Sequence, residues 1–127
     1  MPLTLLEEKE KRFTERLRGW ALSFLDFNRP EPTEWEVLSI CLDEKGFGVS
    51  RQRLASELSF LVGTQLIRVF PAGSGKELTD IEQQQLLQRC SRDETVAAST
   101  LIWIRTEGIN LVEGRERVSG VQRVRIK

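Results

Sequence analysis

The side chains best suited to hydrogen bonding with a partner lie in the segment VSRQRLASELSFLVG, which begins at Val49. It carries Arg51, Gln52 and Arg53 in succession, and Ser56 follows about one helical turn later. Arginine can form two hydrogen bonds with guanine and glutamine two with adenine, so these residue types are typical of base contact in the major groove. The pattern predicts a DNA-reading helix with these four side chains on its exposed part.

The spacing of apolar residues supports a helix in this segment. Leu54, Leu58 and Leu61 recur three or four positions apart and predict one buried face. Ser50 is a candidate N-cap and Gly63 a candidate end of the helix. Ser50 is also among the expected DNA contacts.

Charge outside this segment limits how DNA binding can arise. The chain has 127 residues, with 19 Lys and Arg against 19 Asp and Glu, so DNA binding must come from local positive clusters. The final segment RERVSGVQRVRIK is such a cluster, although a charged run is also typical of a solvated tail. The expected phosphate contacts are Arg68, Arg115, Arg117, Arg123 and Arg125.

Catalysis, metal binding and a cofactor are not expected. The chain has no histidine and no tyrosine, and no nucleophile lies beside an evident base. Cys41 and Cys90 lack the close spacing of a zinc site, so we expect buried or half-buried free thiols. The segment GSGK at 73–76 lacks the other residues of a phosphate loop and predicts a turn.

Periodicity and start signals predict the helical elements. Apolar residues at spacings of three and four predict a first helix over 3–28, which the segment around Pro30 ends. A helix-turn-helix is expected over 33–63, with Thr33 and Glu36 as the capping box of its first helix.

Two short segments rich in β-branched and aromatic residues, 66–70 and 100–106, are expected to form the strands of a wing. The insertion between them, residues 71–99, contains its own helix signal. Thr79 and Glu82 have the spacing of a capping box, and an incomplete apolar stripe follows them.

Together these elements predict one α+β domain over 1–127 that is mainly helical. We expect a winged helix-turn-helix with a long N-terminal helix and an inserted helical segment between the two wing strands. The C-terminal extension over 107–127 would begin with a helical turn capped by Thr106 and end in the basic tail. The absence of a long apolar run predicts a cytoplasmic protein without a membrane partner.

Two motifs resemble a family of small winged-helix proteins encoded by Mu-like phages and prophages. In that family the helix V-S-R-x-x-[LV]-x-x-x-L-x-[FW]-L is followed by a wing and by T-x-x-G-x-x-x-x-x-G-R-x-x-V-x-G-V. Here the motifs are filled by Val49, Ser50, Arg51, Leu54, Leu58, Phe60 and Leu61, and by Thr106, Gly108, Gly114, Arg115, Val118, Gly120 and Val121.

The resemblance covers roughly residues 12–70 and 100–123. The chain departs from the family in its wing, where the family has only a short connection. The resemblance implies the winged-helix fold and a phage or prophage setting within a bacterial host cell. It does not supply an established activity.

Two functions from different classes remain open. The first is a phage or prophage regulator or DNA-associated factor that binds double-stranded DNA. The second is a protein-interaction or assembly adaptor, acting as a homodimer or with a phage protein partner and without DNA. Zero net charge, the insertion, and Glu57 near the expected reading face favour the second.

We expect Trp20, Trp35 and Trp103 in the core, although Trp20 and Phe24 could instead pair with a second copy.

Overall fold

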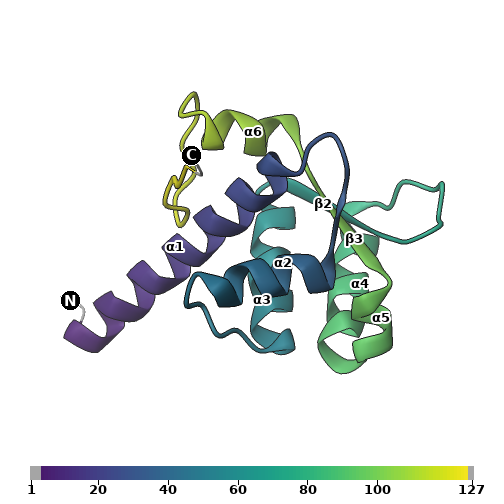
Figure 1. The fold of residues 1–127 in the computed structure, drawn as a ribbon, viewed down its shortest axis with the longest axis horizontal. Coiled ribbons are helices and arrows are strands. Elements are labelled where there is room, and N and C mark those ends of the chain that lie inside the picture. Colours follow the sequence, from purple (N-terminus) through teal and green to yellow (C-terminus); the bar gives the residue numbers. More distant parts are fainter. Residues whose placement is uncertain (1–3, 126–127) are drawn as a thin grey trace.

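The structure, a computed structural model, describes residues 4–125 and is mainly helical, with one small sheet (Figure 1). The elements in chain order are α1 (Leu5–Phe27), β1 (Thr33–Glu34), α2 (Trp35–Glu44), α3 (Arg51–Gly63), β2 (Ile67–Pro71), α4 (Asp80–Arg92), α5 (Glu94–Ala98), β3 (Thr100–Ile104) and α6 (Thr106–Val112). The predicted α+β class is therefore confirmed.

The three strands form one antiparallel sheet in the order β1-β3-β2. Ile102 in the central strand lies opposite Thr33 of β1 and Val69 of β2. Side chains alternate between the two faces, so Ile67, Val69, Ile102 and Ile104 are buried against the helices. Arg68 and Trp103 consequently lie on the outer face, directly opposite each other.

Two of the predicted helix starts are wrong. Thr33 does not cap α2, because its backbone is taken up by pairing with β3; the N-cap is Glu34, which forms no side-chain cap bond. Thr106 lies inside α6, whose N-cap is Arg105. Extended backbone at Thr33 was compatible with either an N-cap or a strand, and only the partner strand decides between them.

The other boundaries agree closely with the prediction. Within the described residues α1 begins at Leu5 rather than residue 3, and it ends at Phe27. The strand predicted over 66–70 is shifted by one residue to 67–71. The second strand ends at Ile104 rather than 106, because Arg105 is the N-cap of α6 and the helix begins at Thr106.

Leucine side chains from α1, α2 and α3 form the centre of the core. Those with no exposed surface are Leu17, Leu22, Leu38, Leu42, Leu58 and Leu61.

Cys90 is buried and Cys41 half-buried, as predicted for free thiols. The prediction that all three tryptophans are core residues is wrong: Trp35 is buried and Trp20 half-buried, but Trp103 is 37% exposed.

The 71–99 insertion adds an ordered helical layer to the domain. Its helix α4 lies alongside α3, and α5 packs against α2 (Figure 1). The side chain of Gln83 is buried, and its Oε1 accepts a hydrogen bond from the backbone N–H of Val69 at 3.0 Å. Leu86 and Leu87 extend the core beneath α4. The predicted capping box of Thr79 and Glu82 is present at the start of this helix.

The C-terminal extension folds back onto α1. The backbone N–H of Gln122 donates to the carbonyl of Glu15 at 3.0 Å, and the hydroxyl of Ser23 donates to the carbonyl of Val124. Gly19 lies under this segment, so close that a Cβ atom there would overlap the carbonyl oxygen of Gln122. Residues 114–124 are therefore part of the folded domain, while Lys127 lies outside the described residues.

Candidate nucleic-acid interface

Helix α3 lies between α1 on one side and α4 on the other (Figure 1). Its N-terminus forms as the sequence predicts: the Ser50 hydroxyl accepts a hydrogen bond from the backbone N–H of Arg53 at 3.0 Å. Ser50 thereby satisfies one of the free amides that every helix start leaves. Its side chain is used for capping, although the residue itself is exposed.

Only a narrow strip of α3 faces solvent. Gln52 and Ser56 are exposed, and they point away from the buried Leu54, Leu58 and Leu61. Both side chains are uncharged. The strip can therefore supply hydrogen bonds to a partner, but α3 alone offers no cation at its centre.

Arg53 makes contacts within the protein through all three guanidinium nitrogens. Nε donates to Glu57 at 2.7 Å, Nη1 to Glu10 at 2.9 Å and Nη2 to the hydroxyl of Thr14 at 2.7 Å. Burial by itself would lower the pKa of Arg53, but the hydrogen bonds to Glu57 and Glu10 outweigh it and the pKa is raised. A DNA contact by Arg53 would require these bonds to be given up.

Glu57 points toward α1 and not toward the expected reading face. It is 6% exposed, and its second carboxylate oxygen forms a 2.7 Å ion pair with Nε of Arg18. The guanidinium of Arg18 also lies 3.6 Å from the ring centre of Phe60 and donates to the carbonyl of Gly120. Glu57 is thus the centre of a charged cluster that joins α1, α3 and the C-terminal extension.

Arg51 lies on the flank of α3 that faces α2 and α5. It is half-buried, and its Nε is buried without a hydrogen-bond partner. It lines a cavity of about 310 Å³ together with Trp35 and Glu94. Arg51 and Arg53 therefore lie on opposite flanks of the helix, although they are only two positions apart in the sequence.

Helix α4 supplies cations and amides next to the exposed strip of α3. Nε2 of Gln52 donates to the carbonyl of Ser91 at 3.2 Å, which ties the start of α3 to the end of α4. We define the α3–α4 face as the exposed, outward side chains Gln52, Ser56, Gln85, Gln88 and Arg92. None of these five side chains is acidic, and all of them can donate a hydrogen bond.

Arg68 lies on a separate surface, the outer face of the sheet. It forms an ion pair with Glu77, and its guanidinium carbon lies 5.5 Å from the ring centre of Trp103. The sheet is placed against the helical core through its other face, so Arg68 does not adjoin the exposed strip of α3.

The tail arginines lie near α6, at the opposite end of the molecule from α5 (Figure 1). Arg115 contacts Asn110 and Glu113, and Nε of Arg123 donates to the carbonyl of Val112 at 2.9 Å. Arg117 and Arg125 are exposed. The ten expected DNA contacts are therefore distributed over three surfaces and do not form one site.

Three surface features were not predicted from the sequence. They are the exposed cations Arg89 and Arg92 of α4, Arg29 beside the sheet, and the exposed Trp103. The exposure of Trp103 had a signal, because it alternates with the apolar residues Ile102 and Ile104 in the strand TLIWI. The sequence carries no signal for the position of Arg29, because that position beside the sheet depends on how the segment after α1 folds.

Comparison of the chain with known protein families, with curated proteins and with solved structures gives no match. Among residues 4–125, no helix combines the length and apolar character that a membrane span needs. The same described part of the chain contains no group of three His, Cys, Asp or Glu side chains suited to holding a metal ion.

Proposed function

We propose that the chain is a winged-helix protein that binds double-stranded DNA through the α3–α4 face. The elements α1, β1, α2, α3, β2 and β3, with the sheet order β1-β3-β2, follow the arrangement of a winged helix-turn-helix, with α3 as the third helix. The insertion of α4 and α5 replaces the tip of the wing. The resemblance to proteins of Mu-like phages and prophages suggests a phage regulator or DNA-associated factor.

The observation that carries this proposal is the composition of the α3–α4 face. Its five exposed side chains are amides, a hydroxyl and a guanidinium, which are groups that commonly bond phosphate oxygens. Arg89 is exposed on the same helix and adds a second cation nearby. None of the five side chains of this face is a carboxylate, in a chain of zero net charge.

The position of α4 limits the depth at which α3 enters DNA. A major groove is about 12 Å wide and accommodates one helix. Packed helices have axes about 8–10 Å apart, so α3 and α4 together are wider than the groove. We therefore propose contacts mainly with the phosphates of the groove edges, and low sequence specificity.

The test is fluorescence anisotropy with a random-sequence duplex at two salt concentrations. We expect micromolar binding that weakens with salt, with a logarithmic slope of about −2 to −3 for two or three phosphate contacts. Arg92→Glu should weaken binding about tenfold. Arg12→Glu, an equal charge change on the exposed start of α1, is the matched control and should leave binding within about twofold.

One observation favours the adaptor function as a second candidate. The first two turns of α1, residues 5–12, are exposed, and Leu5 and Leu6 are 71% and 78% exposed (Figure 1). Light scattering across a concentration series measures whether these turns associate with a second copy. A monomer that binds duplex DNA would exclude the homodimer form of the adaptor proposal.

A further inference from the structure

The outer face of the sheet presents an aromatic surface to solvent. Trp103 of β3 lies opposite Arg68 of β2, and its ring centre is 6.4 Å from that of Phe70, with the rings inclined by 57°. Soluble domains usually cover a tryptophan or place it in an interface. Here the helices pack against the other face of the sheet, so no described element covers this ring fully.

Two hollows meet at this tryptophan. The larger, of about 690 Å³, lies between the end of α1, the sheet and the start of α6, and it is lined in part by Arg29, Arg105 and Thr106. The smaller, of about 200 Å³, lies under the loop that follows β2 and is lined in part by Lys76. Both are lined by Arg68 and Trp103, so the two hollows adjoin at this pair of side chains on the outer face of the sheet, and we call them together the track.

The cations of this track come from separate segments of the chain. Arg29 follows α1, Arg68 is in β2 and Arg105 follows β3, and Nη1 of Arg105 is held by Oε1 of Gln65 at 2.8 Å. Lys76 brings the number of lining cations to four, against the three carboxylates Asp26, Glu77 and Glu107.

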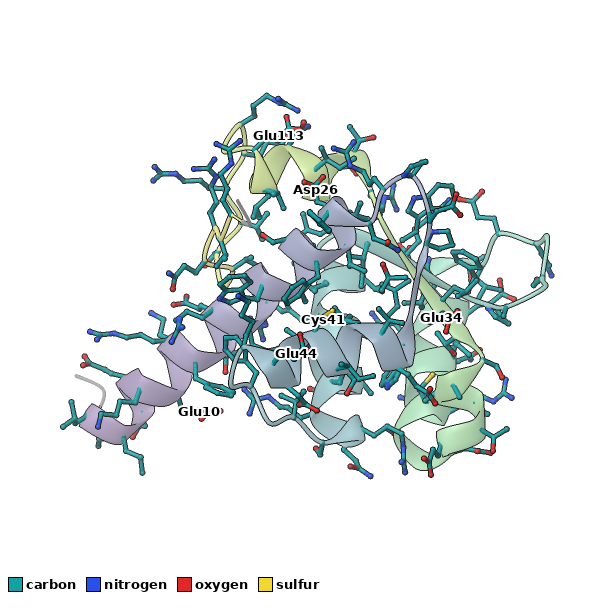
Figure 2. All side chains as sticks on the ribbon, viewed as in Figure 1. Glu10, Asp26, Glu34, Cys41, Glu44 and Glu113 are labelled. Atoms are coloured by element: carbon teal, nitrogen blue, oxygen red, sulfur yellow. The ribbon has the colours of Figure 1, made fainter. Side chains whose placement is uncertain are left out.

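The carboxylates that pair with these cations can be exchanged for another anion. Glu77, the partner of Arg68, has a side chain that is 75% exposed, and Glu107, the partner of Arg105, is 47% exposed. Ion pairs that are this exposed contribute little free energy. Arg29 lies near two carboxylates, Asp26 at 2.8 Å and Glu113 at 3.9 Å. Figure 2 labels both of these acidic residues, at adjoining ends of α1 and α6.

We propose that this track binds a single strand of nucleic acid, with one base stacked on Trp103 and the neighbouring phosphates held by Arg68 and Arg105. Aromatic rings beside arginines on an open sheet face are suited to unpaired bases, whose flat faces are accessible. The bases of a duplex are stacked on one another and cannot use the ring in this way. The track extends to both sides of Trp103, which suits a strand better than a single nucleotide.

This site is separate from the α3–α4 face, so it would add an unpaired strand to the proposed duplex contact. It rests on different residues and does not depend on duplex binding. A protein with both surfaces would bind DNA that contains a duplex next to a single strand more tightly than either alone.

The test is titration of the full chain with an oligothymidine of about 10 nucleotides, a length within the range of single-strand sites. Fluorescence of the protein and anisotropy of a labelled strand are both recorded. We expect quenching that Trp103→Phe abolishes, while that variant keeps most of the affinity because phenylalanine still stacks. Trp103→Ala should reduce affinity about tenfold.

Charge variants separate this site from the α3–α4 face. Arg68→Ala should weaken single-strand binding and reduce its salt slope by about 0.7, whereas Arg12→Ala should change neither. Arg92→Glu should weaken duplex binding only. Thermal melting confirms that each variant is folded. Absence of oligothymidine binding at low salt, or equal affinity of Trp103→Ala and the unmodified chain, would overturn the proposal whatever the duplex result.

Discussion

Glu57 of α3 and Arg18 of α1 form a 2.7 Å ion pair across the interface between the two helices, and Arg53 bonds the other oxygen of the same carboxylate. One buried acid therefore holds two arginines at fixed positions. The same contact orients α3 relative to α1 and turns Arg53 away from solvent.

Replacement of Glu57 by glutamine should lower the free energy of unfolding by about 2–3 kcal/mol. The change removes the carboxylate that two partly buried guanidinium groups share, and the loss of a buried charge partner costs more than the pair itself contributes. Urea denaturation measures the effect. Glu8→Gln removes an exposed acid of α1 and should stay within about 0.5 kcal/mol. Equal stability of the two variants would show that the cluster is not a structural contact.

Gly19→Ala should loosen the C-terminal segment although alanine favours helices. Alanine is favoured over glycine within a helix by about 1 kcal/mol. The added Cβ would however overlap the carbonyl oxygen of Gln122 and displace the C-terminal segment from α1. We expect faster trypsin cleavage after Arg117 and a net loss of about 1–2 kcal/mol.

Gly63→Ala is the matched control for this glycine. It lies at the end of α3, and the nearest atom to an added Cβ is Nε2 of Gln84 at 3.9 Å, which is ordinary contact. This variant should be neutral or more stable by up to about 1 kcal/mol. Unchanged proteolysis of Gly19→Ala would contradict the packing of the tail on α1.

The two thiols should react with a disulfide reagent at very different rates. Burial raises the pKa of Cys90, and burial followed by the charge of Glu44 raises the pKa of Cys41, which lies near it on α2 (Figure 2). Both are therefore protonated at neutral pH, and only Cys41 has exposed surface. We expect one slowly reacting thiol that is lost in Cys41→Ser and accelerates at alkaline pH. A second thiol that reacts without denaturant would contradict the burial of Cys90.

The capping box of α4 should make stability depend on pH in the acid range. Hydrogen bonds from Thr79, first from its backbone N–H, lower the pKa of Glu82. The unfolded chain therefore binds a proton at Glu82 more strongly than the folded chain does. The stabilisation by the Glu82 carboxylate is present above the ordinary glutamate pKa of about 4.3 and is lost as pH falls below it. Thermal melting of Glu82→Gln should show a reduced pH dependence between about pH 3 and 6, and Thr79→Ala, which keeps the backbone N–H donor, should show a smaller reduction. An unchanged profile in both variants would argue against the box in solution.

Local sequence signals predicted most of the fold because they act through neighbouring residues. The cap at Ser50, the box at Thr79 and the leucine face of α3 depend only on residues a few positions apart, and all three are present. The strand at Thr33 could not be predicted in the same way, because two residues form a strand only when a distant partner lies beside them.

The candidate site was predicted less well for a related reason. Arg53 has the residue type and position of a DNA contact, but its partners Glu10 and Thr14 are some forty positions away and occupy its guanidinium. The layer formed by α4 was likewise not evident, since an amphipathic pattern shows that a helix is buried on one face and not against which neighbour.

The most direct test of the proposed function is the affinity of the full chain for a random duplex, measured by anisotropy at low salt for the unmodified protein, Arg92→Glu and Arg12→Glu. The account predicts micromolar binding that falls about tenfold in Arg92→Glu alone. No binding at low salt, or equal affinities of the two variants, would contradict duplex binding by the α3–α4 face.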